Sequence, residues 1–450
     1  MVFEETSMTS AATTSAVEVP PAEPLVGNYF VAVYPPFSCW QPAQLPAVEE
    51  ALQRPADDSP MGIYVHIPFC QKKCDYCYYL SFAGTPARMV DDYIGSVVEE
   101  AALYSDYAGV GGRPVSFVYF GGGTPSTLTN SQLGLLAAGL KNFLPWKGVQ
   151  EVTFECAPCS VRPELLQMLR QIGVTRLSMG VQSLDNAVLS ANGRMHLAQD
   201  VARAYGLIQE ARFNWVNLDL MVGLMGETPE GWENTMRRMI ELRPDSVTIY
   251  QTEIPHNTLM YQRLKQGRER APSVSWGEKR ARLDAGFKQL ERAGYKIVSA
   301  YSAVRDPDRH QFQYQNRLWR GGDMLGLGVA AFSYFGGVHF QNAVTPQSYR
   351  GQVRRGDLPL QRALRLTQRD QLVREFVLQL KLGEVSVGCF RDKFGEDITH
   401  VFAPQLSQLS AEGFLTVSGS AVRLTRAGLL CVDRLLPRFY DPQHQALRYT

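Results

Sequence analysis

The sequence predicts an α/β protein: a partial (β/α)6 TIM-type barrel, preceded by an N-terminal extension and followed by a C-terminal winged-helix-like domain. Six short runs of β-branched and aromatic residues alternate with amphipathic helical patterns, as in βα units around a parallel sheet. After about residue 365 the pattern changes to helix, helix and hairpin, which is the order of a winged helix.

The expected strands are short, mostly apolar runs, and they cover residues 62–67, 116–120, 151–155, 176–181, 216–221 and 246–251. Between the first two, helical spacing places Tyr93, Val97 and Ala101 on one face. A later helix is expected to begin at Pro163 and to end before Gly173, since Pro suits the first helical position and Gly the position past the end.

Four segments are expected along the chain: a disordered arm at 1–24, an aromatic extension at 25–58, a barrel at 59–360 and the winged-helix-like domain at 361–450. The arm is rich in Ser, Thr, Ala, Pro and Glu. The extension contains "NYFVAVYPPFSCW", which is too apolar to stay exposed, so we expect it to pack over the barrel.

Composition excludes several classes of protein. Lys and Arg (45) nearly balance Asp and Glu (44), and the C-terminal domain has no basic stripe, so we expect no nucleic-acid partner. There is no apolar run of membrane-spanning length and no secretory signal pattern, so we expect a cytoplasmic protein without a membrane partner. Eight cysteines in 450 residues are too few for a disulfide framework.

Three cysteines, Cys70, Cys74 and Cys77, follow the first expected strand with the spacing C-x3-C-x2-C. Structural zinc and ordinary ferredoxin clusters both require four protein ligands. Three close thiolates leave one iron of a 4Fe-4S cubane without a protein ligand, and that iron is free to bind a small molecule. The missing fourth cysteine therefore favours a catalytic cluster.

Other unusual residues also follow the expected strands. The run Gly121 to Thr124 comes after the second strand, Glu155 and Cys156 end the third, and Gln182 follows the fourth. In barrels of this kind the chemistry lies at the carboxyl ends of the strands. Glycines there allow the backbone to approach a ligand closely.

These residues carry a family resemblance. The cysteine spacing, with aromatic Tyr76 before the third cysteine, resembles the cluster loop of the radical S-adenosylmethionine enzymes. The motifs "YVHIPFC", "YFGGGTPS", "GVQS", "GRMH", "NLDLMVGLMGET" and "MLGLGVAAFS" resemble the branch that includes oxygen-independent coproporphyrinogen III dehydrogenase. The resemblance extends from about residue 62 to the C-terminus.

The resemblance implies specific roles. Catalysis and metal binding are expected of Cys70, Cys74 and Cys77, which hold a 4Fe-4S cluster. Binding of S-adenosylmethionine is expected of Tyr64, Tyr76, Gly122, Gly123, Thr124, Glu155, Gln182, Arg194 and Asp219. The implied partners are a small-molecule substrate and a flavodoxin or ferredoxin as electron donor.

Among the branches, the chain resembles most the class C members, which transfer a methyl or methylene carbon and bind two S-adenosylmethionine molecules. The dehydrogenases continue the cluster loop with a further cysteine where this chain has Tyr79. We therefore expect methylation or cyclopropanation of a natural product, with the loop 321–334 around Gly328 as the wall of a second cofactor pocket.

Two alternatives remain open: the coproporphyrinogen dehydrogenase itself and a haem-handling protein. The haem-chaperone relatives carry a His-Asn pair where this chain has Gln315 and Asn316, so a haem ligand there would be replaced by Cys39, His310 or His339.

The remaining cysteines are interpreted as structural. Cys156 and Cys159 form a C-x2-C pair at a strand end, which is also typical of metal or redox sites. Cys389 and Cys431 are expected to be buried apolar residues.

Overall fold

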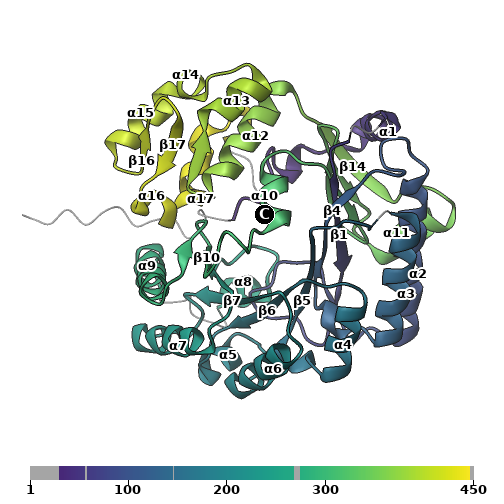
Figure 1. Cartoon of the computed structure of the whole chain (residues 1–450), viewed down its shortest axis with the longest axis horizontal. Coiled ribbons are helices and arrows are strands. Elements are labelled where there is room, and N and C mark those ends of the chain that lie inside the picture. The colour runs from purple at the N-terminus through teal and green to yellow at the C-terminus, as the bar shows by residue number, and fades with distance from the viewer. Residues whose placement is uncertain (1–29, 56–57, 145, 268–273, 446–450) are drawn as a thin grey trace, which may run out of the picture.

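The computed structural model describes residues 30–55, 58–144, 146–267 and 274–445, so the expected disordered arm at 1–24 lies outside the described residues. A large sheet is wrapped by helices on its outer side, and the C-terminal segment packs beside it as a separate group of elements (Figure 1). No helix in the described residues is both long and apolar enough to cross a membrane.

All six expected strands are present at the centre of the sheet, and they are β1 (Met61–Ile67), β4 (Val115–Gly122), β5 (Glu151–Cys156), β6 (Arg176–Gln182), β7 (Trp215–Val222) and β8 (Ser246–Gln251). They pair in parallel and in chain order. Their carboxyl ends consequently meet at one rim, which confirms the partial α/β barrel.

The sheet continues beyond this central part on both sides. One side adds β10 (Ser302–Val304) and β9 (Lys296–Ile297), and the other adds β11 (Met324–Leu327), β12 (Phe332–Phe335), β13 (Val338–Asn342) and β14 (Leu360–Arg365). Only β11 joins the parallel set, through β1. The expected boundary at 360/361 falls at the start of β14, and the four-segment division stays a prediction.

The outer helices that follow the central strands are α2 (Ala87–Ser105), α3 (Asn130–Phe143), α4 (Pro163–Gln171), α5 (Asn186–Ala191), α6 (Ala198–Glu210), α7 (Pro229–Leu242), α8 (Leu259–Lys265) and α9 (Trp276–Arg292). The expected face of α2 is buried, including Tyr93, Val97 and Ala101. Helix α4 begins at Pro163, and Gly173 lies just beyond its end with a positive φ of 92°. Local sequence and packing therefore agree along these helices.

Residues 30–55 pack on the rest of the protein, as expected for the aromatic extension. They include the short turns Phe37–Cys39 and Pro42–Gln44 and helix α1 (Pro46–Gln53). The backbone of Gln41 pairs with Ala363 of β14, and the buried Lys381 Nζ donates to the carbonyl of Val31 at 2.7 Å. The extension thus connects the large sheet with the C-terminal elements.

Two further helices, α10 (Gln313–Trp319) and α11 (Pro346–Arg354), precede β14 and lie on the barrel side. The C-terminal group comprises α12 (Gln368–Leu380), β15 (Glu384–Ser386), α13 (Val387–Phe394), α14 (Ile398–Val401), α15 (Ala403–Ala411), β16 (Leu415–Val417), β17 (Ala421–Leu424), α16 (Arg426–Leu430), α17 (Val432–Leu435) and α18 (Pro442–Gln445). The expected helices and hairpin are present, and β15 adds an edge strand in the order β15-β17-β16. Cys431 is buried as expected, but Cys389 is exposed, because it faces away from the side of α13 that packs Phe390 and Phe394.

Two glycines, one in the sheet and one in a helix, provide a test of this packing. A Cβ atom added at Gly326 in β11 would lie 2.3 Å from the carbonyl oxygen of Phe332, whereas one added at Gly206 in α6 meets no atom within 4 Å. We expect Gly326→Ala to lower the free energy of unfolding by about 1–3 kcal/mol. We expect Gly206→Ala to raise it by about 0.5–1 kcal/mol, because Ala loses less entropy in a helix. Chemical denaturation of the two variants checks this, and equal effects would contradict the described packing.

Candidate functional site

The three thiols lie on the loop that leaves β1. Cys70 ends the short strand β2 (Phe69–Cys70), which pairs with β3 (Phe82–Ala83), and Cys74 and Cys77 follow in the intervening loop. The Sγ of Cys70 accepts a hydrogen bond from Thr124 Oγ1 at 3.4 Å, and the Sγ of Cys74 accepts one from Arg194 Nη1 at 3.1 Å. None of the three thiols is in a disulfide.

Asp75, which lies between Cys74 and Cys77, holds the loop that carries the three cysteines in place. Its carboxylate accepts from Arg263 Nη1 of α8 at 2.8 Å, and its backbone carbonyl accepts from the Met260 N–H at 2.8 Å. Asp75 also packs against Gly193, where an added Cβ would approach its Oδ1 to 2.9 Å. The loop that carries the thiols is therefore held by α8 and by the turn after α5.

Burial raises the pKa of the Cys70 thiol and raises that of the Cys77 thiol to about 11, with the neighbouring Cys74 adding to both. The Cys70 and Cys77 thiols therefore stay protonated unless a cation compensates the thiolate charge. Their chemistry therefore fits a metal cluster as the ligand of this loop.

A glycine cradle lies next to the thiols, at the end of β4. The N–H of Gly123 donates to the carbonyl of Ile67 at 2.8 Å, and Gly122 has a φ of 112°. An added Cβ at Gly122 would lie 2.5 Å from the His66 ring, and one at Gly123 would lie 2.8 Å from the carbonyl oxygen of Phe69. Only glycine fits here, because a side chain would meet the His66 ring or the backbone of the loop that leaves β1.

Two partly buried carboxylates continue the rim. Glu155 accepts from Tyr119 Oη at 2.6 Å and from the Gly122 N–H at 3.2 Å, and Asp219 accepts from Ser178 Oγ at 2.9 Å. Burial raises the pKa of Glu155 to about 7, with a further contribution from Asp219, and burial raises the pKa of Asp219 to about 6. A cationic ligand group would relieve both carboxylates.

Polar groups without protein partners lie between the thiols and the carboxylates. Arg194 donates through Nη2 to the Gly180 carbonyl at 2.7 Å, but its buried Nε has no partner among the described residues. The buried hydroxyl of Tyr76 also has none there. Gln182 holds a left-handed backbone with a φ of 66° at the end of β6. Buried polar groups are rarely left unpaired, so these atoms fit a site that binds a polar ligand.

The structure thus brings the expected site residues to one rim. It also places two residues there that sequence reasoning missed, His66 and Tyr119. Tyr64 stacks on Tyr119 with ring centroids 5.9 Å apart, and its hydroxyl lies 3.1 Å from Nδ1 of His66. His66 also contacts the cradle through Gly122. In a strand, every second side chain lies on the same face of the sheet. His66 is two residues after Tyr64 in β1, and Tyr119 pairs with Tyr64 from β4, so this spacing could have identified both residues from the sequence.

The expected wall of a second cofactor pocket at Gly328 is wrong. The Gly328 N–H donates to the buried Glu100 Oε2 at 2.7 Å, and an added Cβ would lie 2.3 Å from the Tyr93 hydroxyl. This loop is packed on helix α2, because the absent side chain makes room for protein atoms.

The residues considered as substitute haem ligands are also engaged within the protein. His310 and His339 are buried and lie 3.1 Å from the carbonyl oxygens of Asn214 and Tyr34, and Cys39 Sγ lies 3.6 Å from His444 Nδ1. Of the C-x2-C pair, Cys156 is buried and Cys159 is exposed, and both are free thiols. Their interpretation as structural residues stays a prediction.

Comparison with known proteins agrees with this geometry. Residues 64–239 match the family described as the radical SAM superfamily, and residues 366–431 match the HemN C-terminal domain. The heme chaperone HemW of Escherichia coli is 30% identical over 84% of this chain and 98% of its own length, and that of Bacillus subtilis is 28% identical over the same shares.

Coproporphyrinogen oxidases match over similar lengths. The oxygen-independent coproporphyrinogen III oxidase of Pseudomonas aeruginosa is 27% identical over 84% of this chain and 86% of its own length. The solved structure of coproporphyrinogen III oxidase (HemN) from Escherichia coli, described as a radical SAM enzyme, superposes with a TM-score of 0.80 at 25% identity, covering 91% of this chain and 96% of that one.

These findings confirm the expected cofactors, a 4Fe-4S cluster and S-adenosylmethionine. They contradict the expected methyl or methylene transfer to a natural product, because the relatives are heme chaperones and coproporphyrinogen oxidases. Tyr79 in place of a further cysteine was therefore a misleading guide to the reaction.

The thiol assignment is tested by replacing one member of the loop. We expect Cys74→Ala to lose most of its iron and acid-labile sulfide after anaerobic reconstitution, because two thiolates do not hold a cubane cluster. Cys389→Ala, at an exposed position on α13, is the matched control and should load as the wild type does. Iron and sulfide analysis with visible absorption measures both, and full loading of Cys74→Ala would overturn the assignment.

Proposed function

The chain belongs to the radical SAM superfamily and carries a HemN C-terminal domain, and from this premise we propose that it acts on a tetrapyrrole of the coproporphyrinogen type. The proposal rests on one observation: three free thiols, a glycine cradle and two partly buried carboxylates lie at one rim. The porphyrin-precursor substrate rests on the relatives, among which are coproporphyrinogen oxidases.

In this proposal Cys70, Cys74 and Cys77 hold the cluster. When bound, the cluster and S-adenosylmethionine supply a 5'-deoxyadenosyl radical that abstracts hydrogen from an unactivated C–H bond. A flavodoxin or ferredoxin would deliver the electron. The protein contributes binding, orientation and exclusion of water around the reacting groups.

The rim residues are assigned by charge and position. Glu155 carries negative charge above pH 7 and would accept hydrogen bonds from the ammonium group of the cofactor. Arg194, through its unpartnered Nε, would bind the carboxylate, and the bare backbone of Gly122 and Gly123 would lie along the methionyl chain. Gln182 and Asp219 would hold the ribose hydroxyls.

A surface for the substrate is offered by tyrosines beside the thiols. Tyr79 follows Cys77 by two residues, is 49% exposed, and stacks on Tyr78 with ring centroids 4.6 Å apart. Tyr250, at the end of β8, is also exposed. Aromatic faces of this kind pack well against a large ring system.

A second candidate function is haem handling. It is favoured by the heme chaperones, which the chain matches over 98% of their length at 28–30% identity.

The two candidates are separated by one anaerobic experiment on cluster-loaded protein. With dithionite and S-adenosylmethionine, we expect coproporphyrinogen III to lose carbon dioxide from its propionates, with 5'-deoxyadenosine formed in proportion to product. Mass spectrometry and liquid chromatography measure both. Tight haem binding without any conversion of coproporphyrinogen III would instead establish the haem-handling function.

The pH dependence of cofactor binding tests the assignment of Glu155. Burial raises its pKa above the ordinary value to about 7, so the carboxylate is mostly neutral at pH 6 and mostly ionised at pH 7.5. Because only the ionised form attracts an ammonium group, we expect the affinity for S-adenosylmethionine to rise about eightfold across this range. Calorimetric titration of unreduced, cluster-loaded protein measures it.

The matched variants are Glu155→Gln, which should flatten the profile, and Glu210→Gln, an exposed position of α6 that should leave it unchanged. A wild-type affinity that does not change between pH 6 and 7.5 would count against the role of Glu155.

A further inference from the structure

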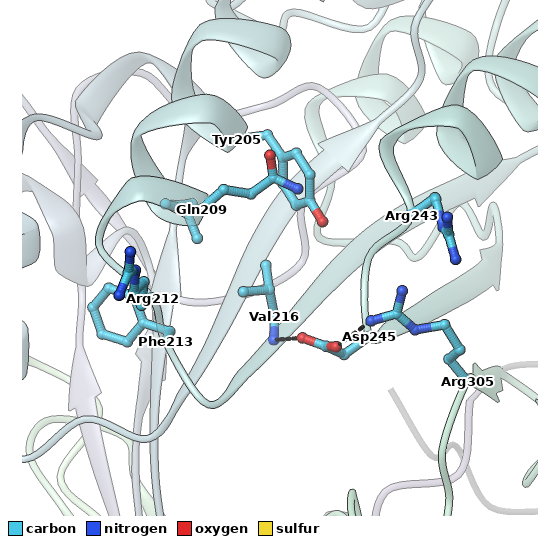
Figure 2. A pocket seen from close by; sticks show the side chains of 9 residues that line it. Tyr205, Gln209, Arg212, Phe213, Val216, Arg243, Asp245 and Arg305 are labelled. Carbon is cyan, nitrogen blue, oxygen red and sulfur yellow. Dashed lines mark hydrogen bonds and ion pairs between the residues drawn. The ribbon is translucent and has the colours of Figure 1, made fainter.

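A cavity of about 430 Å³ lies at the opposite end of the barrel from the thiols. It is lined by Tyr205, Ile208, Gln209, Arg212, Phe213, Val216, Arg243, Asp245 and Arg305. The lining comes from helix α6, from the turns and first residues at the amino ends of β7 and β8, and from Arg305 after β10 (Figure 2). Since the thiols and carboxylates lie at or beyond the carboxyl ends of the strands, this cavity is separate from the site described above.

The charges of the cavity lining do not balance, because it contains three arginines and one carboxylate. Asp245 is fully engaged: its Oδ2 accepts from the Val216 N–H at 2.9 Å, and its Oδ1 accepts from Arg305 Nη2 at 2.8 Å. Within the described part of the chain, the guanidinium groups of Arg212 and Arg243 make no hydrogen bond or ion pair. The lining therefore carries a net positive charge, on arginine side chains that are exposed to solvent.

Backbone conformation gives a second observation on the same two arginines. Only four non-glycine residues of the described chain have a positive φ: Gln182, Arg212, Arg243 and Ala330. Gln182 belongs to the expected cofactor site. Arg212 follows α6 with a φ of 53°, and Arg243 follows α7 with a φ of 54°.

Other helices of this protein end differently. Gly173 after α4 and Gly294 after α9 adopt the left-handed conformation at no steric cost. An arginine in that conformation is strained, and the two arginines that adopt it both line this one cavity.

An arginine near the carboxyl end of a helix is attracted by the negative end of the helix dipole. This attraction does not explain the presence of both Arg212 and Arg243. At α6, Arg170 Nη1 already donates to the carbonyls of Ala211 and Arg212, at 3.0 and 2.7 Å. A helix end carries only about half a negative charge, which leaves the cavity positive even after this contribution.

We propose that this cavity is a binding site for a small organic phosphate. Guanidinium groups match phosphate oxygens with paired, charge-assisted hydrogen bonds, and a dianion balances the two uncompensated arginines. Figure 2 shows Arg243 and Arg305 beside each other on one side of the cavity, and Arg212 with Phe213 on the other side. Arg212 and Arg243 supply the charge that holds the phosphate, Arg305 stays paired with Asp245, and the organic part packs against Tyr205 and Phe213.

The test uses the full-length protein and two anionic probes, pyrophosphate and the dianion malonate, with potassium chloride at matched ionic strength as the reference. We expect saturable binding of pyrophosphate by calorimetry together with a raised melting temperature, and weaker binding of malonate. Stronger binding of malonate, or no pyrophosphate binding above the chloride reference, would overturn the proposal.

The double variant Arg212→Gly, Arg243→Gly removes both guanidinium groups while placing glycine where the left-handed backbone favours it, so the fold is retained. We expect its pyrophosphate affinity to fall at least about tenfold, given the usual strength of charge-assisted hydrogen bonds. Arg292→Ala, at the last turn of α9 and outside the cavity, is the control and should bind as the wild type does. Unchanged affinity in the double variant would show that the arginines do not form a site.

Discussion

The candidate site depends on a close backbone contact between the end of β4 and the loop that leaves β1. The N–H groups of Gly123 and Thr124 donate to the carbonyls of Ile67 and Phe69, both at 2.8 Å. This contact requires glycines without side chains, and it places Thr124 against Cys70 and Gly122 against Glu155. The parallel order of the central strands then brings β6 and β7 to the same rim. A side chain at Gly123 would separate the thiol loop from the cradle.

The electrostatics of the rim follow from this compact arrangement. Burial raises the pKa values of Glu155 and Asp219 and of two of the thiols, while Arg194 is the cation that contacts the thiol loop. Holding several acidic groups in a dry rim is costly unless a ligand brings positive charge. An iron-sulfur cluster and a cofactor with ammonium and sulfonium groups supply that charge. The protein is therefore arranged for ligands whose charge complements the rim.

Much of this arrangement could be predicted from the sequence, since strong local patterns determine it. The six central strands, the thiol spacing and the glycine run all follow directly from residue order. The flanking strands β9 to β14 were not expected, because runs of two to six residues carry little periodic signal. Gly328 was misread because a glycine near a site can serve protein packing as well as ligand approach. His66 and Tyr119 were missed because their role depends on which strand faces they share. The reaction was misjudged because loop residues such as Tyr79 do not determine the substrate.

The central claim, that this rim cleaves S-adenosylmethionine reductively, is tested most directly by product stoichiometry. Cluster-loaded protein, reduced with dithionite and supplied with S-adenosylmethionine, should form methionine and 5'-deoxyadenosine in equal amounts, and omission of the reductant should abolish both. A protein with a complete, reducible cluster that forms neither product would contradict the account.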